Sequence, residues 1–318
     1  MSYFRQKFLL PALLVGLTRA VFACDACALY LPSGETNPGY ALAIAGQFTR
    51  LGTTWAGDRR QPNPVEQYLE SSITQFTVSY SRGGRWHGQL TVPYIQRSYL
   101  RPNHALVETG RESGWGDATL AMRYEAWRRE TAGGGWMLGL VGGVKFATGD
   151  ASRLGDAVGH HHHHHANFPD SGVHGHDLAL GSGSTDWLIG ADAEWWHARF
   201  FSGGGLQYKL RRPGAFDYRL ADEVSWEAGP GWQVVLAQDR SLRVQALFSA
   251  EHRSLDTLAG VAQVDTGFSA HYLGLRLAGT WRRHFSAEAS VEKPVRIRTS
   301  ELQVVPDYRL RAAATWRF

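Results

Sequence analysis

The end of the chain, residues 308–318, carries the pattern that most restricts the possible fold. One face of this segment is apolar or small and consists of Tyr308, Leu310, Ala312, Ala314, Trp316 and Phe318. The other face is basic or small and consists of Arg309, Arg311, Ala313, Thr315 and Arg317. Side chains alternate in this way only along a β-strand, so the segment is expected to be a strand between an apolar and a polar environment.

The same period of two recurs upstream. Leu242, Val244 and Ala246, for example, alternate with Arg243 and Gln245. The expected strands cover 40–53, 67–81, 86–99, 116–128, 135–147, 185–197, 199–211, 223–236, 241–253, 267–280, 284–296 and 304–318. A soluble β-sandwich would show similar alternation, with the apolar face as its core.

The lengths of the connections favour a membrane barrel over a sandwich. Long connections are expected at 54–66, 100–115, 148–184, 212–222 and 254–266, with a shorter one at 297–303. Tight turns, such as 82–85 and 238–240, lie between them. Short periplasmic turns and long outer loops are typical of outer-membrane barrels. We therefore predict an all-β fold, an antiparallel transmembrane β-barrel of about twelve strands with both termini in the periplasm.

The N-terminal residues 1–23 are expected to be a signal peptide. Arg5 and Lys7 precede an apolar stretch, and Ala23 ends a small-residue cleavage pattern. Acylation of Cys24 is the alternative, but Phe22 is bulky for a lipoprotein signal. Residues 24–38 would then be a periplasmic segment, and residues 39–318 the barrel with a His-rich outer loop at 148–184. No later uncharged apolar run is as long as the roughly 18 residues of a spanning helix.

The charge of the chain gives no reason to expect a nucleic-acid partner. The formal net charge is +4, and the signal segment contributes Arg5, Lys7 and Arg19 to it, so the mature chain is almost neutral. The expected partners are outer-membrane lipid, a small-molecule or metal solute and the barrel-assembly machinery. The last is expected because the strand ending at Phe318 resembles the terminal strand that this machinery recognises in outer-membrane barrels.

Three glycine-rich motifs, in this order, resemble those of a known family. They are Gly116-Asp117-Ala118-Thr119-Leu120, then Val144-Lys145-Phe146-Ala147-Thr148-Gly149-Asp150, then Leu180-Gly181-Ser182-Gly183-Ser184-Thr185-Asp186. Together with Val291-Glu292-Lys293-Pro294-Val295, they make the chain resemble the outer-membrane proteins named for the meta-pathway of phenol degradation. Ala147 departs from the family pattern, which has proline there. The resemblance implies a barrel and transport, sometimes of aromatic or other hydrophobic compounds, and no catalytic residues.

Histidines are concentrated in the longest connection. The candidate metal ligands there are His160, His161, His162, His163, His164, His165, His174, His176 and Asp177. Neutral imidazoles at this density bind borderline metals such as Zn, Cu or Ni. A solvated low-complexity loop that responds to mild acid and an inserted purification tag are the other two interpretations.

Cys24 and Cys27 form a Cys-x-x-Cys pair at the start of the expected mature chain. In an oxidising compartment this pair is expected to be a disulfide, with a soft-metal pair as the alternative. No histidine follows Cys27, so attachment of a c-type haem is not indicated.

The polar faces of the expected strands supply charged groups of both signs to the barrel interior. The candidate lumen residues are Arg123, Lys145, Asp192, Glu194, Lys209, Glu227, Arg243, Glu251, Arg276, Glu288, Glu292, Arg309 and Arg311. Mixed signs in a narrow interior favour ion pairs that brace the wall over a strongly selective pore.

Three classes of function follow. The first is a passive outer-membrane channel or transporter for small solutes, hydrophobic and aromatic or metal-associated. The second is a metal-binding or metal-sensing surface protein. The third is an outer-membrane lipase or protease, for which His252 and Ser254 are the only loose candidates; without a motif around them, we expect no enzyme activity.

Overall fold

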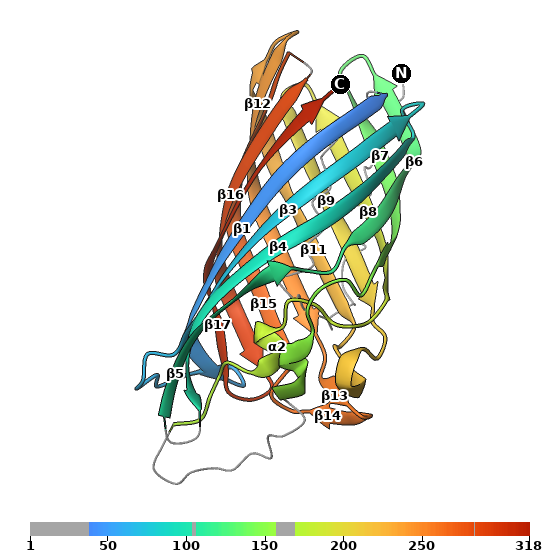
Figure 1. The fold of residues 1–318 in the computed structure, drawn as a ribbon. Coiled ribbons are helices and arrows are strands. Elements are labelled where there is room, and N and C mark those ends of the chain that lie inside the picture. Colours follow the sequence, from blue (N-terminus) through green and yellow to red (C-terminus); the bar gives the residue numbers. More distant parts are fainter. Residues whose placement is uncertain (1–37, 104–105, 157–168, 283) are drawn as a thin grey trace, which may run out of the picture.

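The computed structural model describes residues 38–103, 106–156, 169–282 and 284–318. Within these residues twelve long strands form one antiparallel sheet that closes on itself (Figure 1). They are β1 (Gly39–Ala56), β3 (Tyr68–Arg82), β4 (Trp86–Asn103), β6 (Thr119–Thr131), β7 (Gly134–Lys145), β8 (Asp186–His197), β9 (Phe200–Leu210), β11 (Glu223–Leu236), β12 (Arg240–Arg253), β15 (Phe268–Trp281), β16 (Phe285–Thr299) and β17 (Gln303–Arg317). The pairing of β17 with β1, from Ala41 opposite Arg317 to Trp55 opposite Gln303, closes the barrel. The all-β barrel with twelve strands is therefore confirmed.

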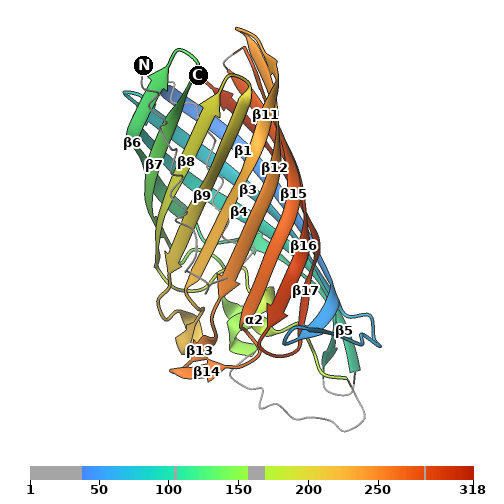
Figure 2. The ribbon, with the colours of Figure 1, turned by 180° about the vertical axis from the view of Figure 1, so that it is seen from behind.

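The two ends of the barrel differ in the length of their connections. At one end, called here the turn end, tight turns join β3 to β4, β6 to β7, β8 to β9, β11 to β12 and β15 to β16. Residues 83–85 join β3 to β4, and Gly83 and Gly84 have φ values of 61° and 71°, since two consecutive residues with positive φ suit the twist of a tight hairpin. The long connections, with α2 (Gly175–Leu178), lie at the opposite end, called here the loop end (Figures 1 and 2).

The prediction of one loop is wrong. Residues 100–115 were expected to be a long connection, but β4 continues to Asn103 and Leu106–Trp115 forms strand β5 beside it. Side-chain polar contacts hold this hairpin, since Glu108 accepts hydrogen bonds from the Arg101 Nε and Asn103 Nδ2 of β4, each at 2.9 Å. The Gly, Glu, Ser and Arg residues of this segment lack the apolar alternation of the other strands, so the pattern indicated a loop.

The outer surface of the barrel is apolar and its inner surface is polar. Along β3, Phe76 and Val78 are exposed, whereas Gln75, Thr77 and Ser79 are buried toward the interior. This is the reverse of a soluble sandwich, and a closed sheet is the β-structure that satisfies its backbone groups in lipid. Aromatic side chains pair near the turn end, with ring centroids 4.5 Å apart for Trp86 and Tyr124, as in an interfacial girdle. The barrel therefore has the architecture of an outer-membrane protein.

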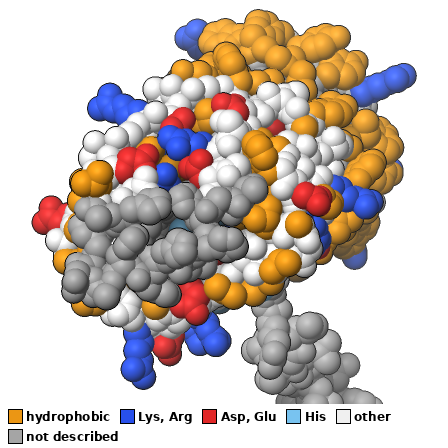
Figure 3. Space-filling view, turned by 60° about the horizontal axis from the view of Figure 1, so that its bottom comes forward, with side chains coloured by type: hydrophobic (Ala, Val, Ile, Leu, Met, Phe, Trp, Pro, Cys, Tyr) orange, Lys and Arg blue, Asp and Glu red, His pale blue; other side chains and the backbone are white. Residues whose placement is uncertain are grey.

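Short elements decorate the loop end. They are β2 (Arg59–Gln61), η2 (Ser152–Gly155), η3 (Ala215–Asp217), β10 (Tyr218–Arg219), β13 (Asp256–Leu258) and β14 (Val261–Gln263). No helix in the described parts of the chain is long and apolar enough to cross a membrane. Figure 3, which looks toward this end, shows charged and polar side chains over the mouth and apolar side chains along the wall.

Candidate functional site

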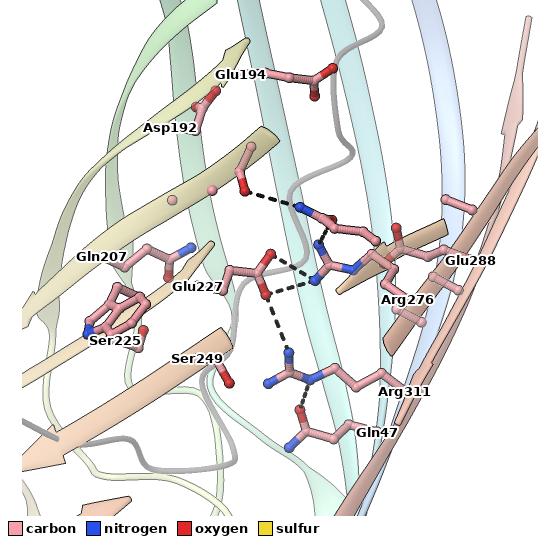
Figure 4. Close-up of a pocket in the computed structure, with 18 of the residues that line it drawn as sticks. Gln47, Asp192, Glu194, Gln207, Ser225, Glu227, Ser249, Arg276, Glu288 and Arg311 are labelled. Carbon is pink, nitrogen blue, oxygen red and sulfur yellow. Dashed lines mark hydrogen bonds and ion pairs between the residues drawn. The ribbon is translucent and has the colours of Figure 1, made fainter. Parts of the chain in front are cut away.

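A network of ion pairs crosses the barrel interior. Arg276 on β15 contacts Glu227 on β11 at 2.7 Å, and Arg311 on β17 reaches the same carboxylate at 3.7 Å. Arg311 also lies 2.9 Å from Glu292 on β16 and donates a hydrogen bond to Gln47 on β1 at 2.9 Å (Figure 4). β15, β16, β17 and β1 are consecutive in the closed sheet. β11 is separated from β15 by β12 and from β17 by β12, β15 and β16, so the contact between Arg311 and Glu227 crosses the lumen.

Arg309 is a buried cation of this network. Its side chain is 3% exposed and contacts Glu251 at 2.8 Å and Glu292 at 3.9 Å. Its guanidinium also lies 4.7 Å from the ring centroid of Tyr272, a cation–π contact. Two carboxylates and an aromatic ring therefore compensate for the burial of one positive charge.

A second set of pairs lines the opposite side of the interior. Arg123 on β6 bonds to Asp192 on β8 at 2.6 Å, and Arg243 on β12 lies 3.6 Å from Glu194 on β8. Glu288 lines the same cavity.

Two lysines form ion pairs nearer the loop end. Lys145 contacts Asp117 at 2.5 Å and Asp186 at 3.0 Å, and Lys209 pairs with buried Glu223. Each residue expected to face the lumen thus lies in the interior, and nearly all of them form ion pairs.

A cavity of about 240 Å³ lies between the two sets of ion pairs. Gly203, Gly204 and Gly205 of β9 form part of its wall, where the absence of side chains leaves space. Apolar groups, among them Ile73 and Phe201, line it beside the charged groups. The interior therefore combines charged and apolar surface and can receive a small solute.

The described parts of the connection between β7 and β8 fold into the mouth of the barrel. We call residues 148–156 and 169–184 the plug. Leu178 packs with Leu69, Tyr99, Val173 and Val304, and Leu180 packs with Ile73 and Ile95 on the inner wall. Both Leu154 and Leu178 are fully buried.

Polar contacts add to this packing. Arg97 of β4 donates a hydrogen bond to the Ala179 carbonyl at 2.9 Å, and the Gly172 N–H donates to Gln67 Oε1 at 2.7 Å. The plug is thus attached to the inner wall through both apolar and polar groups. The pattern of strands and connections predicted an outer loop here and did not predict that part of it enters the barrel. The apolar residues Leu154, Val173, Leu178 and Leu180 were a signal that part of it is buried.

The plug brings together three of the histidine-loop residues singled out as metal ligands. His174, His176 and Asp177 place one ligand atom each within 4.8 Å of one another. The imidazoles of His174 and His176 stack with ring centroids 5.5 Å apart, and His176 Nε2 lies 3.2 Å from Asp177 Oδ1. Asp265, which the sequence analysis did not select, comes from the β14–β15 connection and lies 3.4 Å from His174 Nε2.

Charge coupling in this cluster shifts two pKa values. Burial opposes protonation of His176, but the carboxylates of Asp177 and Asp256 outweigh it and raise the pKa of this imidazole. Burial likewise opposes ionisation of Asp177, but His176 and His174 together hold the pKa of this carboxyl well below its usual range. The six candidate ligands His160 to His165 and the pair Cys24 and Cys27 lie outside the described residues.

No family model matches the chain, and no curated protein matches it either. Among solved structures, the COG4313 outer membrane channel from Pseudomonas putida F1 is similar, at 15% identity with a TM-score of 0.62 over 94% of this chain and 100% of that one. The beta domain of the Bordetella autotransporter Brka, at 10% identity, gives a TM-score of 0.47 over 89% of this chain and 100% of that one. The NanC porin, at 9% identity, gives 0.44 over 87% and 100%.

The first of these likenesses places the chain in the class of outer-membrane β-barrels by its fold. This agrees with the apolar outer wall and with the outer-membrane location expected from the sequence. The resemblance to the family named for the meta-pathway of phenol degradation has no matching family model behind it and stays a prediction.

Proposed function

We propose that the protein is a passive outer-membrane channel or transporter for small amphiphilic solutes, such as aromatic compounds that carry a polar or charged group. The observation that supports this proposal is the cavity inside the closed barrel, which is lined by both ion pairs and apolar side chains. The apolar groups can contact a ring, and the charged groups can bind its polar substituent. The plug covers the loop end of this route, so passage depends on its movement or on gaps around it.

Flux into liposomes tests the proposal. Purified barrel in liposomes should admit benzoate faster than a disaccharide, because the cavity is small and contains both apolar and charged groups. Empty liposomes measure leakage through lipid, and heat-modifiable migration on gels verifies that the inserted protein is folded. A folded barrel that admits neither ions nor benzoate would rule out this function.

Ion selectivity should depend on Glu227. Replacing it by glutamine leaves Arg276 and Arg311 without their shared carboxylate, which makes the lumen more positive. We expect the anion-to-cation permeability ratio to rise about fivefold, the equivalent of roughly 1 kcal/mol for one charge contact in a wet environment. The reversal potential across a salt gradient measures this ratio. Glu301→Gln, an exposed carboxylate between β16 and β17, is the matched control and should leave the ratio unchanged.

A second candidate is a metal-binding or metal-sensing surface protein. The specific observation in its favour is the cluster of His174, His176 and Asp177. Replacing His174 and His176 by glutamine, which leaves the backbone of the plug intact, separates the two functions, since a change in metal uptake or tolerance without a change in solute flux would favour the sensor.

We propose no enzymatic role. His252 is flanked on β12 by the inward-facing Glu251 and Arg253, so strand alternation directs its side chain to the outer face of the wall. Lipase and protease assays of His252→Ala beside the unaltered protein check this proposal.

A further inference from the structure

We propose that the plug contains a binding site for one borderline divalent cation, such as Zn²⁺, Ni²⁺ or Co²⁺, formed by His174, His176 and Asp177 and oriented by Asp265. Two imidazoles and a carboxylate are a common ligand set for such ions. Unlike a run of consecutive histidines, these three ligands are held in a defined arrangement by a folded element. The proposal does not depend on solute transport.

His176 and Asp177 lie close together in a buried position. The side chain of His176 is 3% exposed, and its Nε2 is buried without a hydrogen bond even though Asp177 Oδ1 lies 3.2 Å away. A simple imidazolium–carboxylate pair would direct an N–H at that oxygen. Two ligand atoms bound to one tetrahedral metal ion lie about 3.4 Å apart, given metal–ligand distances near 2.1 Å. The separation of these two atoms therefore suits a shared cation.

His174 lies between two carboxylates. Its Nε2 lies 3.4 Å from Asp265 Oδ2, and its Nδ1 lies 3.8 Å from Asp177 Oδ2. A metal-binding histidine usually donates the N–H of its other ring nitrogen to a carboxylate, which fixes the tautomer and the ring orientation. Asp265 is in place for this role, which leaves Nδ1 on the side of Asp177 and His176.

The surroundings fix the ligands and leave a path for the ion. The His174 backbone N–H donates a hydrogen bond to Asp177 Oδ2 at 2.9 Å, so the carboxylate is held and Oδ1 faces His176. The ring of His176 also stacks on Tyr218, with centroids 6.4 Å apart.

The guanidinium of Arg253 lies near the cluster but donates a hydrogen bond to the Thr266 carbonyl at 3.2 Å. His174 and Asp177 are about one-fifth exposed, so a cation can reach the cluster from the loop end.

A cation here would connect two loops that are distant in sequence. The three ligands belong to the plug, whereas Asp265 belongs to the connection that precedes β15. Metal binding would hold the plug against this connection and so stabilise the closed mouth.

The test uses the full chain, folded in detergent, with changes that remove the other metal ligands. The parent protein has asparagine at positions 160–165 and serine at positions 24 and 27. Titration of the parent with Zn²⁺ should show one equivalent bound. Asp265→Asn should weaken the affinity about tenfold or more, as expected for a carboxylate that orients a ligand. His176→Asn should abolish the stoichiometric binding, and His284→Asn, an exposed histidine near the turn end, should leave it unchanged.

A spectroscopic variant covers the case in which His176→Asn disturbs the plug itself. In His174→Cys, a thiolate replaces a partly exposed imidazole, and added Co²⁺ should produce a sulfur-to-cobalt charge-transfer absorption that the parent lacks. Heat-modifiable migration verifies that each variant is folded. Failure of the folded parent to bind Zn²⁺ would overturn the proposal, as would stoichiometric binding that survives His176→Asn, or the absence of the charge-transfer band in folded His174→Cys.

Discussion

Leu178→Asp should raise the ion conductance of the barrel severalfold. Leu178 is fully buried between the plug and the inner wall, where a carboxylate would lie among the apolar side chains of the cluster and where the nearby Arg97 already donates to the Ala179 carbonyl. Because burial of an unpaired charge is costly, the plug should leave its position and open the mouth at the loop end. Single-channel recordings in planar bilayers measure the change.

The matched control is Val264→Asp. Val264 is 50% exposed and also lies at the loop end, so the new charge remains in water there and the conductance should stay at its original level. Limited proteolysis reports whether the plug has moved. If the plug becomes sensitive to protease in Leu178→Asp while the conductance does not change, the plug does not control the route.

Arg309→Met should lower the free energy of unfolding by roughly 3–5 kcal/mol, the usual cost of removing one partner from a buried ion pair. The substitution leaves Glu251 and Glu292 close together in the interior, with side chains 5% and 0% exposed. Urea unfolding in lipid vesicles, followed by tryptophan fluorescence, measures this difference.

Arg240→Met is the control because Arg240 is exposed at the start of β12, and its effect should stay within about 0.5 kcal/mol. Adding Glu251→Gln to Arg309→Met should recover part of the lost stability, since the carboxylate that lost its ion pair is then neutral, whereas Glu292 keeps its contact with Arg311. A loss below about 1 kcal/mol in Arg309→Met would mean that water in the lumen solvates the two carboxylates.

The sequence predicted the barrel because lipid imposes a simple rule on each strand. Outward side chains must be apolar, and the period of two is then visible wherever a strand crosses the membrane. Strand β5 was missed because Leu106–Trp115 lacks this alternation and is held by polar contacts such as that between Arg101 and Glu108. The pairing of this segment with β4 and its contacts to residues of that strand are not visible in its own local pattern.

The candidate site was predictable only in part. The alternation of side chains along each strand predicted which charged groups point inward. It did not predict that Arg311 reaches Glu227 across the lumen, because that contact depends on the curvature of the closed wall. The density of histidines predicted metal ligands in the 148–184 connection. Asp265, which contacts His174, comes from another loop and could be identified only from the structure.

The ion pairs across the lumen have a consequence for biogenesis. Arg309 and Glu251 belong to strands β17 and β12, which are separated in the sheet by β15 and β16, and Arg243 and Glu194 belong to the similarly separated β12 and β8. Before the sheet closes into a barrel, the two members of each of these ion pairs would face water and lie far apart. The curling of the sheet into a closed wall brings these groups together and removes water from around them, so insertion is expected to end in a cooperative closing event whose rate responds to salt.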